Sequence, residues 1–231
     1  MLVQFGGGIL DARGSIGGQT ASRNRFGNYF RARVTPVNPG TNRQDTVRSA
    51  VAQLAARWKS DLTQDHRDAW EVYAANIVRH NKLGGQIRLT GFNHFIRGNV
   101  PRVQSGEGIV DAGPVDLTIP GQDPSMACVV DEGGQAISVA FDNGLPWADQ
   151  DDGVMLVYMS LPHNDSVNFI GGPYRYADKI LGKNGDPPAS PNPVACPFIC
   201  AEGQQVKIRC TISEENGRLS DPFLHQSAVT A

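Results

Sequence analysis

Several residues could perform catalysis or bind a metal, but their spacing does not form a site. Asp65 and His66 are adjacent, yet no nucleophile is partnered with them, so we interpret them as polar positions on a helix surface rather than a catalytic dyad. The remaining histidines are dispersed without a metal-ligand spacing: His80, His94, His163 and His225. The motifs of serine hydrolases, zinc proteases and protein kinases are absent from the sequence. We therefore predict no catalytic residues, and a protein that is not an enzyme.

The cysteines and one acidic run come nearest to a metal site. Cys196 and Cys200 are four positions apart, but no second pair of ligands follows them. We interpret the four cysteines of the chain as buried free thiols in a reducing compartment: Cys128, Cys196, Cys200 and Cys210. The acidic run at residues 149–152 lacks the glycine and the distal glutamate of an EF-hand loop, so we interpret it as a solvated turn. The sequence thus predicts no metal and no cofactor.

The charge of the chain is divided between its two halves. Residues 1–104 contain 15 Lys and Arg against 6 Asp and Glu, a net charge of +9, and residues 105–231 contain 6 against 17, a net charge of −11. A basic half of this kind indicates a negatively charged partner, which is either nucleic acid or the acidic half of a neighbouring copy. No stretch approaches the ~18 apolar residues of a membrane helix, so we expect no membrane partner.

Residues 1–40 are predicted to form an extended arm rich in Gly and Arg. Its glycines are not followed by the residues of a phosphate-binding loop, and they favour a backbone that bends or lies against a surface. Basic and aromatic residues then alternate, a pattern that suits nucleic-acid contacts and also protein–protein interfaces. The candidate interface residues are Arg23, Arg25, Phe26, Tyr29, Phe30, Arg31 and Arg33. We expect this arm to be disordered in an isolated subunit and ordered against neighbours.

Residues 41–104 are predicted to be a helical region. Helix caps are expected at Thr41 or Asn42, at Thr63 and at Thr90. The first two helices form a hairpin in which Trp58 should pack against Trp70. The third helix should run from Gly91 to Val100 and end before Pro101, because proline removes a backbone donor.

Residues 105–113 read as a linker, and residues 114–231 as an antiparallel β-sandwich that is immunoglobulin-like or fibronectin III-like. Apolar and polar residues alternate in short runs, separated by turns rich in Gly, Pro, Asn and Asp, and about seven such strands are typical of this sandwich. Glu214 and Glu215 should lie on the surface of a hairpin turn, and Trp147 should lie in a loop. The predicted fold class is therefore α+β, in several parts.

A set of short motifs carries a resemblance to a known family. The amino-terminal motifs are Arg13-Gly14-Ser15-Ile16-Gly17-Gly18, Ser22-Arg23-Asn24-Arg25, Arg31-Ala32-Arg33, Asn38-Pro39 and Arg43-Gln44. They continue in Leu62-Thr63, Arg67, Trp70 and Leu89-Thr90-Gly91, and the chain closes with Asn216-Gly217-Arg218-Leu219-Ser220. With these motifs the chain resembles a family encoded by tailed bacteriophages and prophages, often among virion structural genes. The resemblance implies a virion component with a basic arm, a helical hairpin and a closing sandwich domain.

These observations lead to one leading expectation and three alternatives. We expect a non-enzymatic structural protein of a tailed-phage virion, assembled in the host cytoplasm, first as a capsid cement or decoration protein whose arm clamps neighbouring subunits. The first alternative is a structural protein of the tail or of the head–tail connector. The second is a nucleic-acid-binding protein with weak, non-specific contacts to packaged DNA. The third, a carbohydrate-binding module, depends on the sandwich and on Trp147. The expected partners are capsid or tail proteins and copies of the chain itself.

Overall fold

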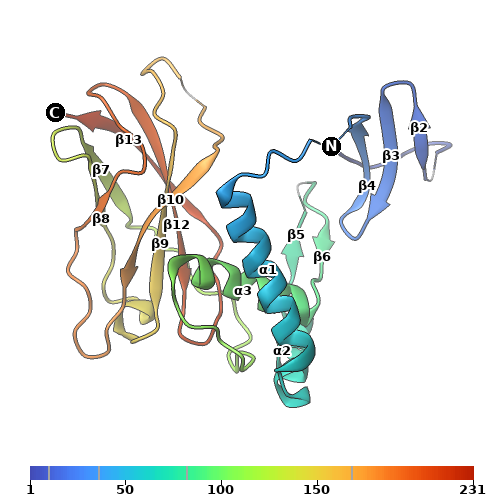
Figure 1. The fold of residues 1–231 in the computed structure, drawn as a ribbon, viewed down its shortest axis with the longest axis horizontal. Helices are drawn as coiled ribbons and strands as arrows, with labels where there is room; N and C mark the ends of the chain where they lie inside the picture. The colour runs from blue at the N-terminus through green and yellow to red at the C-terminus, as the bar shows by residue number, and fades with distance from the viewer. Residues whose placement is uncertain (10, 36, 82, 168) are drawn as a thin grey trace.

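Three helices lie between a small sheet and a larger β-body in the computed structural model, which describes residues 1–231 except Leu10, Pro36, Lys82 and Asn168 (Figure 1). The helices are α1 (Asn42–Ser60), α2 (Gln64–Asn76) and α3 (Gly91–Ser105). The described structure is a mixed α+β fold, as predicted.

The amino-terminal residues form a sheet, and this corrects the expectation of an extended arm. Its strands are β1 (Leu2–Val3), β2 (Gly14–Ile16), β3 (Gln19–Asn24) and β4 (Gly27–Ala32), in the antiparallel order β1-β4-β3-β2. Two tight turns produce the pairing. Gly17, with φ +58°, forms the first turn together with Gly18, and the Asn24 side chain accepts from the Phe26 amide in the second. We call these four strands the amino-terminal sheet.

Each helix begins at a threonine cap, which confirms the predicted starts. The side chains of Thr41, Thr63 and Thr90 each accept a hydrogen bond from the backbone amide three residues later. The helix α3 extends beyond its predicted end, because it continues through Pro101 and stops at Gly106, whose φ is +78°. The missing amide of proline removes one intrahelical bond, but the following residue, Arg102, holds the last turn in place through contacts with the β-body.

The two tryptophans of the helical region share a partner. The rings of Trp58 and Trp70 lie 5.4 and 5.8 Å from the ring of Phe95, which is on α3. The hairpin was predicted to pack these two rings against each other. Instead each ring packs on Phe95, because α1 and α2 both contact α3. The buried residues of this cluster are Leu54, Leu62, Trp70, Tyr73, Ile77 and Phe95. A short hairpin of β5 (Arg79–His80) and β6 (Gln86–Ile87) connects α2 to α3.

The larger β-body has two layers whose apolar faces meet (Figure 1). One layer contains β7 (Ala127–Asp131), β8 (Ala136–Ala140) and β11 (Asn192–Ala195). The other has the order β10 (Tyr174–Leu181), β9 (Val154–Ser160), β12 (Gln205–Ser213) and β13 (Phe223–Thr230), and the end of β13 pairs in parallel with β7. This arrangement is consistent with an immunoglobulin-like or fibronectin III-like domain. Strands β8, β9 and β12 coincide with three of the short runs in the sequence from which strands were predicted, at residues 136–141, 154–161 and 206–213.

The segment expected to be a linker, residues 105–113, is packed against the helices. Asn99 of α3 and Val110 exchange two hydrogen bonds, of 2.8 and 3.1 Å, between the Asn99 side chain and the Val110 backbone. The indole of Trp70 donates to the Asp111 carbonyl at 3.0 Å. Because buried side chains of two helices hold its backbone, this segment is a fixed part of the helical region rather than a free tether.

Candidate interaction surface

All seven candidate interface residues lie on the hairpin of β3 and β4. Arg23 is on β3, Arg25 and Phe26 form the turn, and Arg33 follows the end of β4. The strand β4 carries the other three, which are Tyr29, Phe30 and Arg31. The structure therefore gathers the predicted residues on one element, although that element is a paired hairpin and not an extended chain.

The register of the hairpin divides these residues between its two faces. Arg31 is opposite Thr20, and Tyr29 is opposite Ser22. Arg31 and Tyr29 are two positions apart on β4, so they share a face, whereas Phe30 between them points to the other face. Arg23 is opposite Asn28 and lies on the Phe30 face. Basic and aromatic side chains are thus present on both faces of the sheet.

The arginines of this hairpin lack acidic partners within the described structure. Arg23, Arg25, Arg31 and Arg33 are exposed, and none of them forms an ion pair with a described residue. The sequence contains no Asp or Glu between Asp11 and Asp45. Four uncompensated guanidiniums on a small sheet create a positive potential that attracts negatively charged groups.

The amino-terminal sheet has no buried core. Among the described residues from 1 to 49 none is buried, and Ala50 is the first described residue that is buried. Phe5 and Phe30 meet edge to face with ring centroids 5.9 Å apart, while Ile16 is 89% exposed and Phe26 is 40% exposed. A small sheet needs an apolar face covered by other structure for stability of its own. Within one chain the apolar side chains of the sheet therefore remain partly uncovered.

The sheet touches the helical region through the hairpin of β5 and β6. The Asn81 side chain donates to the Phe26 carbonyl at 3.1 Å. Beside this contact lies an open cleft of about 460 Å³, and the residues that line it include Leu2, Tyr29, His80 and Ile87. Apolar side chains of the sheet therefore face space rather than a packed neighbour along this side.

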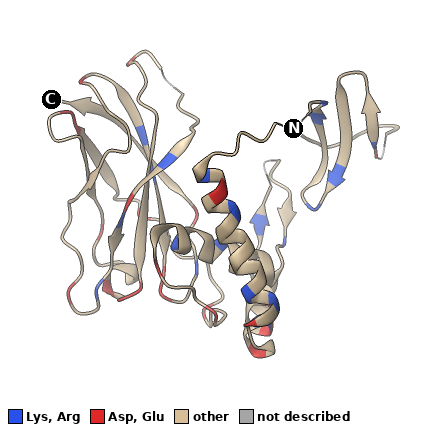
Figure 2. Cartoon of the chain, viewed as in Figure 1, with Lys and Arg blue, Asp and Glu red and all other residues tan. Residues whose placement is uncertain are grey.

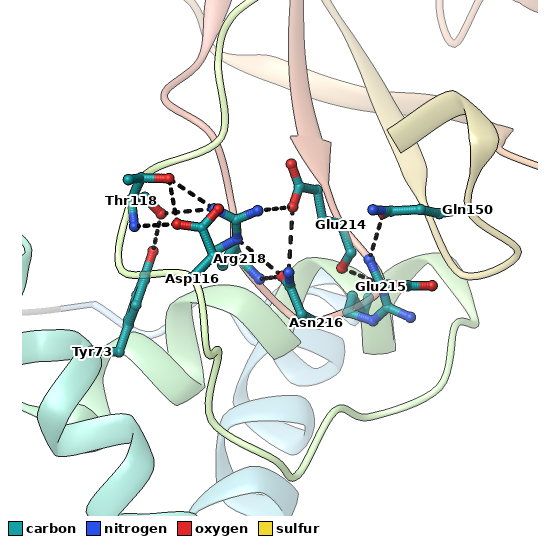
Figure 3. Close-up of polar contacts among 9 residues, drawn as sticks. Tyr73, Asp116, Thr118, Gln150, Glu214, Glu215, Asn216 and Arg218 are labelled. Carbon is teal, nitrogen blue, oxygen red and sulfur yellow. Dashed lines mark hydrogen bonds and ion pairs between the residues drawn. The ribbon is translucent and has the colours of Figure 1, made fainter. Parts of the chain in front are cut away.

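A second charged cluster lies where α2 and α3 meet the sandwich, and it contrasts with the sheet. We call it the joint, and its side chains are Tyr73, Arg79, His94, Arg97, Arg102, Asp116, Glu214, Arg218 and Asp221. Figure 3 shows Arg218 reaching Asp116 on one side and Glu214 on the other. Its guanidinium also donates to the Thr118 hydroxyl at 2.9 Å. Arg79 and Arg97 pair with Asp221 in the same region.

The joint places a guanidinium from the helices inside the sandwich. Arg102 is 1% exposed and donates to the carbonyls of Gly108 and Asp152 and to the hydroxyl of Ser213, at 2.8, 2.9 and 3.3 Å. Burial lowers the pKa of Arg102, and the nearby carboxylate of Asp152 opposes that shift. Since two of these bonds cross from α3 to the loop at Asp152 and to the end of β12, the helices and the sandwich are held together by specific polar contacts.

The joint was missed by the sequence analysis. Glu214 was expected on a solvated turn, but it is 5% exposed and pairs with Arg218 four positions later. One feature of the sequence could have indicated this pair: an acid and a base lie four positions apart around Asn216 and Gly217. The sequence analysis interpreted these residues only as a hairpin turn. Arg102 of α3 contacts the backbone of Glu214 and helps to bury it. Because α3 is more than 100 residues away in the sequence, this contact could not be predicted from the local pattern.

Within the joint, the pKa of His94 is shifted far from its ordinary value. It is 5% exposed, and its Nε2 atom has no hydrogen-bond partner among the described atoms. Burial, together with the positive charges of Arg97 and Arg79, lowers the pKa of His94 to about 4. The cavity beside it has a volume of about 10 Å³, close to the least that holds one water molecule. The joint is thus a packed structural contact with no space for a substrate.

The remaining residues considered for chemistry have structural surroundings. Cys128, Cys200 and Cys210 are buried and Cys196 is half-buried, and burial raises the pKa of the Cys196 thiol to about 12. The carboxylate of Asp149 accepts from the Gly185 amide at 2.7 Å. Within the described residues no group of three or more His, Cys, Asp or Glu side chains could hold a metal ion.

Trp147 does not provide a platform for a ligand. It lies in the short 3₁₀ helix η1 (Pro146–Asp149), is 1% exposed and packs against Phe141 with ring centroids 5.4 Å apart. The carbohydrate-binding alternative depended on this side chain in an open loop. Because the ring belongs to the sandwich core, that basis is wrong.

Comparisons with known proteins identify no family for this chain. No protein-family model and no curated protein matches the chain. A solved structure described as an Fn3-like protein from Clostridium thermocellum is similar to 49% of this chain and is covered over 97% of its own length, with 16% sequence identity and a TM-score of 0.32. Within the described residues no helix is long and apolar enough to cross a membrane.

Proposed function

We propose that this protein is a non-enzymatic assembly component that joins neighbouring proteins through its amino-terminal sheet. One observation carries the proposal: a four-stranded sheet whose aromatic side chains are exposed or half-buried and whose four arginines lack acidic partners among the described residues, with no buried residue in its described part. A sheet of this kind gains stability when another surface covers its apolar side chains and neutralises its charge. The aromatic side chains would supply the anchors and the arginines the orientation.

The setting that we propose is the virion of a tailed phage. Its support is the resemblance of the arm motifs, of Trp70 and of the closing turn to proteins encoded among virion structural genes. In that setting an immunoglobulin-like or fibronectin III-like sandwich, fixed to the helices by the joint, would form a rigid body, and the sheet would be its clamp. A capsid cement or decoration protein is the leading role, and a tail or head–tail connector protein is the alternative.

Incorporation into particles tests this proposal. Virions of the encoding phage would be purified with the intact chain, with a chain lacking residues 1–33, and with Phe26→Ala and Val72→Ala variants. Val72 is an exposed apolar residue of α2, away from the sheet, and serves as the matched control. We expect the intact chain and the Val72 variant in the particles, the Phe26 variant in reduced amount, and the truncated chain in the lysate alone. Absence of the intact chain from particles, or normal incorporation of the truncated chain, would refute the proposal.

Nucleic-acid binding is the second candidate function, because unpaired arginines alternate with aromatic residues on β3 and β4. The two-faced distribution of Arg23 and Arg31 weakens this candidate, since phosphate contacts along a duplex favour charges on one face. If DNA is the partner, binding should be independent of sequence and fall steeply with salt. Fluorescence anisotropy with a labelled duplex, at several salt concentrations, measures both properties.

A further inference from the structure

Exposed carboxylates gather at one end of the sandwich. Hydrogen bonds hold three of its loops together there: Asp149 and Asp151 accept from the amides of Gly185 and Asn184, and Gln150 accepts from the amide of Glu215. The acids of these loops are Asp149, Asp151, Asp152, Asp186 and Glu215, and all five are exposed. We call this group the acidic end. Within the described residues, only Asp151 among them has an ion pair, with Lys183 at 3.9 Å.

The acidic end and the amino-terminal sheet lie far apart in one chain. Figure 2 shows the sheet at one extremity of the molecule and the sandwich, with acidic loops at its lower edge, at the other. The helical region lies between them, so the hairpin arginines cannot neutralise these carboxylates within the same subunit. Two subunits placed in line, however, can bring the sheet of one against the acidic end of the next.

We propose that the amino-terminal sheet docks on the acidic end of a second copy of this chain, in a head-to-tail contact. This inference rests on the proposed function and names the partner. Charge complementarity selects the copy: four unpaired guanidiniums would meet five exposed carboxylates, of which four have no ion pair among described residues. The acidic end also offers an apolar seat, because Leu181 is 48% exposed at the end of β10, beside the Gly153 loop.

The geometry of this contact makes it heterologous. The two surfaces differ, so each subunit that uses its sheet leaves its acidic end available to another subunit. Such contacts continue until a ring closes, or they extend as a filament. A two-fold dimer, in which one patch meets the same patch, would place arginines against arginines and is disfavoured by charge.

Sedimentation velocity on the full-length chain tests the contact. At low ionic strength of about 20 mM, where surface charges act over some 20 Å or more, we expect species larger than monomer that dissociate at about 500 mM salt. The double variant Arg31→Glu with Arg33→Glu should weaken self-association by about tenfold or more. The matched control is Lys59→Glu with Arg88→Glu, which reverses two exposed charges of the helical region and should leave association unchanged. A monomer at both salt concentrations would overturn the proposal.

Mixing two broken variants identifies the geometry. For this experiment a sheet variant with Arg31→Gln and Arg33→Gln retains its acidic end, and a variant with Asp151→Asn and Asp152→Asn retains its sheet. Neutral substitutions are used because charges reversed on both surfaces would attract each other. Each should be monomeric alone, and their equimolar mixture should stop at a dimer, because only one complementary contact can form. Continued growth in the mixture, or no association at all, would overturn the head-to-tail arrangement.

Two further outcomes separate this inference from the proposed function. If the chain stays monomeric but residues 1–33 are still required for incorporation into particles, the partner is another protein, and only the inference fails. If the sheet variant loses binding to a labelled DNA duplex while the intact chain never self-associates, nucleic acid is the partner instead, and both the inference and the assembly proposal fail.

Discussion

The joint and the amino-terminal sheet use arginine in opposite ways. In the joint, Arg102 and Arg218 are buried, and each donates to several oxygens from distant parts of the chain. In the sheet, Arg23 and Arg31 are exposed and have no ion pair among described residues. A buried charge needs partners within the folded chain, because water no longer solvates it. An exposed charge is solvated by water, so it can remain without a partner until another molecule binds. The chain therefore contains both arginines whose contacts are complete and arginines that remain open to a partner.

The joint and the amino-terminal sheet also differ in how closely their backbones approach other residues. Gly98 of α3 lies so close to the turn of the sandwich that a Cβ added there would be 2.2 Å from the Gly217 carbonyl oxygen. At the sheet glycines Gly17 and Gly27 an added Cβ would meet nothing within 4 Å. Close approach of two backbones at the joint fixes the helices on the sandwich, and the open surroundings of the sheet leave it able to accept a partner.

The largest expected effect is at Trp70. Its ring is fully buried between α2 and α3, so Trp70→Ala should lower the free energy of unfolding by ~3–5 kcal/mol, through the lost contacts and the cavity left behind. The matched substitution in the sheet, Phe26→Ala, should change it by less than ~1 kcal/mol, because Phe26 is 40% exposed. Urea denaturation of both variants measures the comparison. Equal losses would show that the sheet packs as firmly as the joint.

Removing the guanidinium of Arg218 should have a comparable or slightly smaller effect. Arg218→Met leaves Glu214 as a buried carboxylate without its partner, and breaking such a pair costs about 3–5 kcal/mol. The double variant with Glu214→Leu should recover most of this loss, because both charges are then absent. Thermal and urea unfolding of the single and double variants complete the cycle. A single variant as stable as the intact protein would mean that the pair is exposed to water.

His94 should make the joint sensitive to acid. Its pKa is about 4 in the folded protein and 6.5 in its ordinary state, so the unfolded chain binds the proton first as the pH falls. Stability should therefore decrease between about pH 6.5 and pH 4, by on the order of 2–3 kcal/mol from this group. His94→Phe retains a ring beside Tyr73 and should remove this part of the slope. An unchanged slope for His94→Phe would contradict the assignment.

The smallest expected effect is that of removing the sheet itself. Deleting residues 1–33 should change the unfolding free energy of the remainder by less than ~0.5 kcal/mol, because no described residue among them is buried. A loss above ~1 kcal/mol would show that the sheet supports the helices within one subunit. This result, set beside Trp70→Ala, measures how unequal the two regions are.

Local features of this fold follow from short stretches of the sequence. The threonine caps at Thr41, Thr63 and Thr90 are set by side chains three residues from their partners. The alternation in β8 and β12 and the apolar run of β9 are likewise properties of neighbouring residues. The concentration of arginine and aromatic residues before residue 34 is likewise a property of the chain, so these seven interface candidates could be named in advance.

Which polar residues are buried, and which surfaces stay uncovered, depends on contacts between residues far apart in the sequence. Glu214 and Trp147 looked like surface positions, and both are buried because α3 and the sandwich core cover them from far along the chain. The strands of the amino-terminal sheet were missed because their pairing depends on two turns rather than on a hydrophobic period. Burial and strand pairing depend on which distant residues meet in space, and a local sequence pattern does not show this.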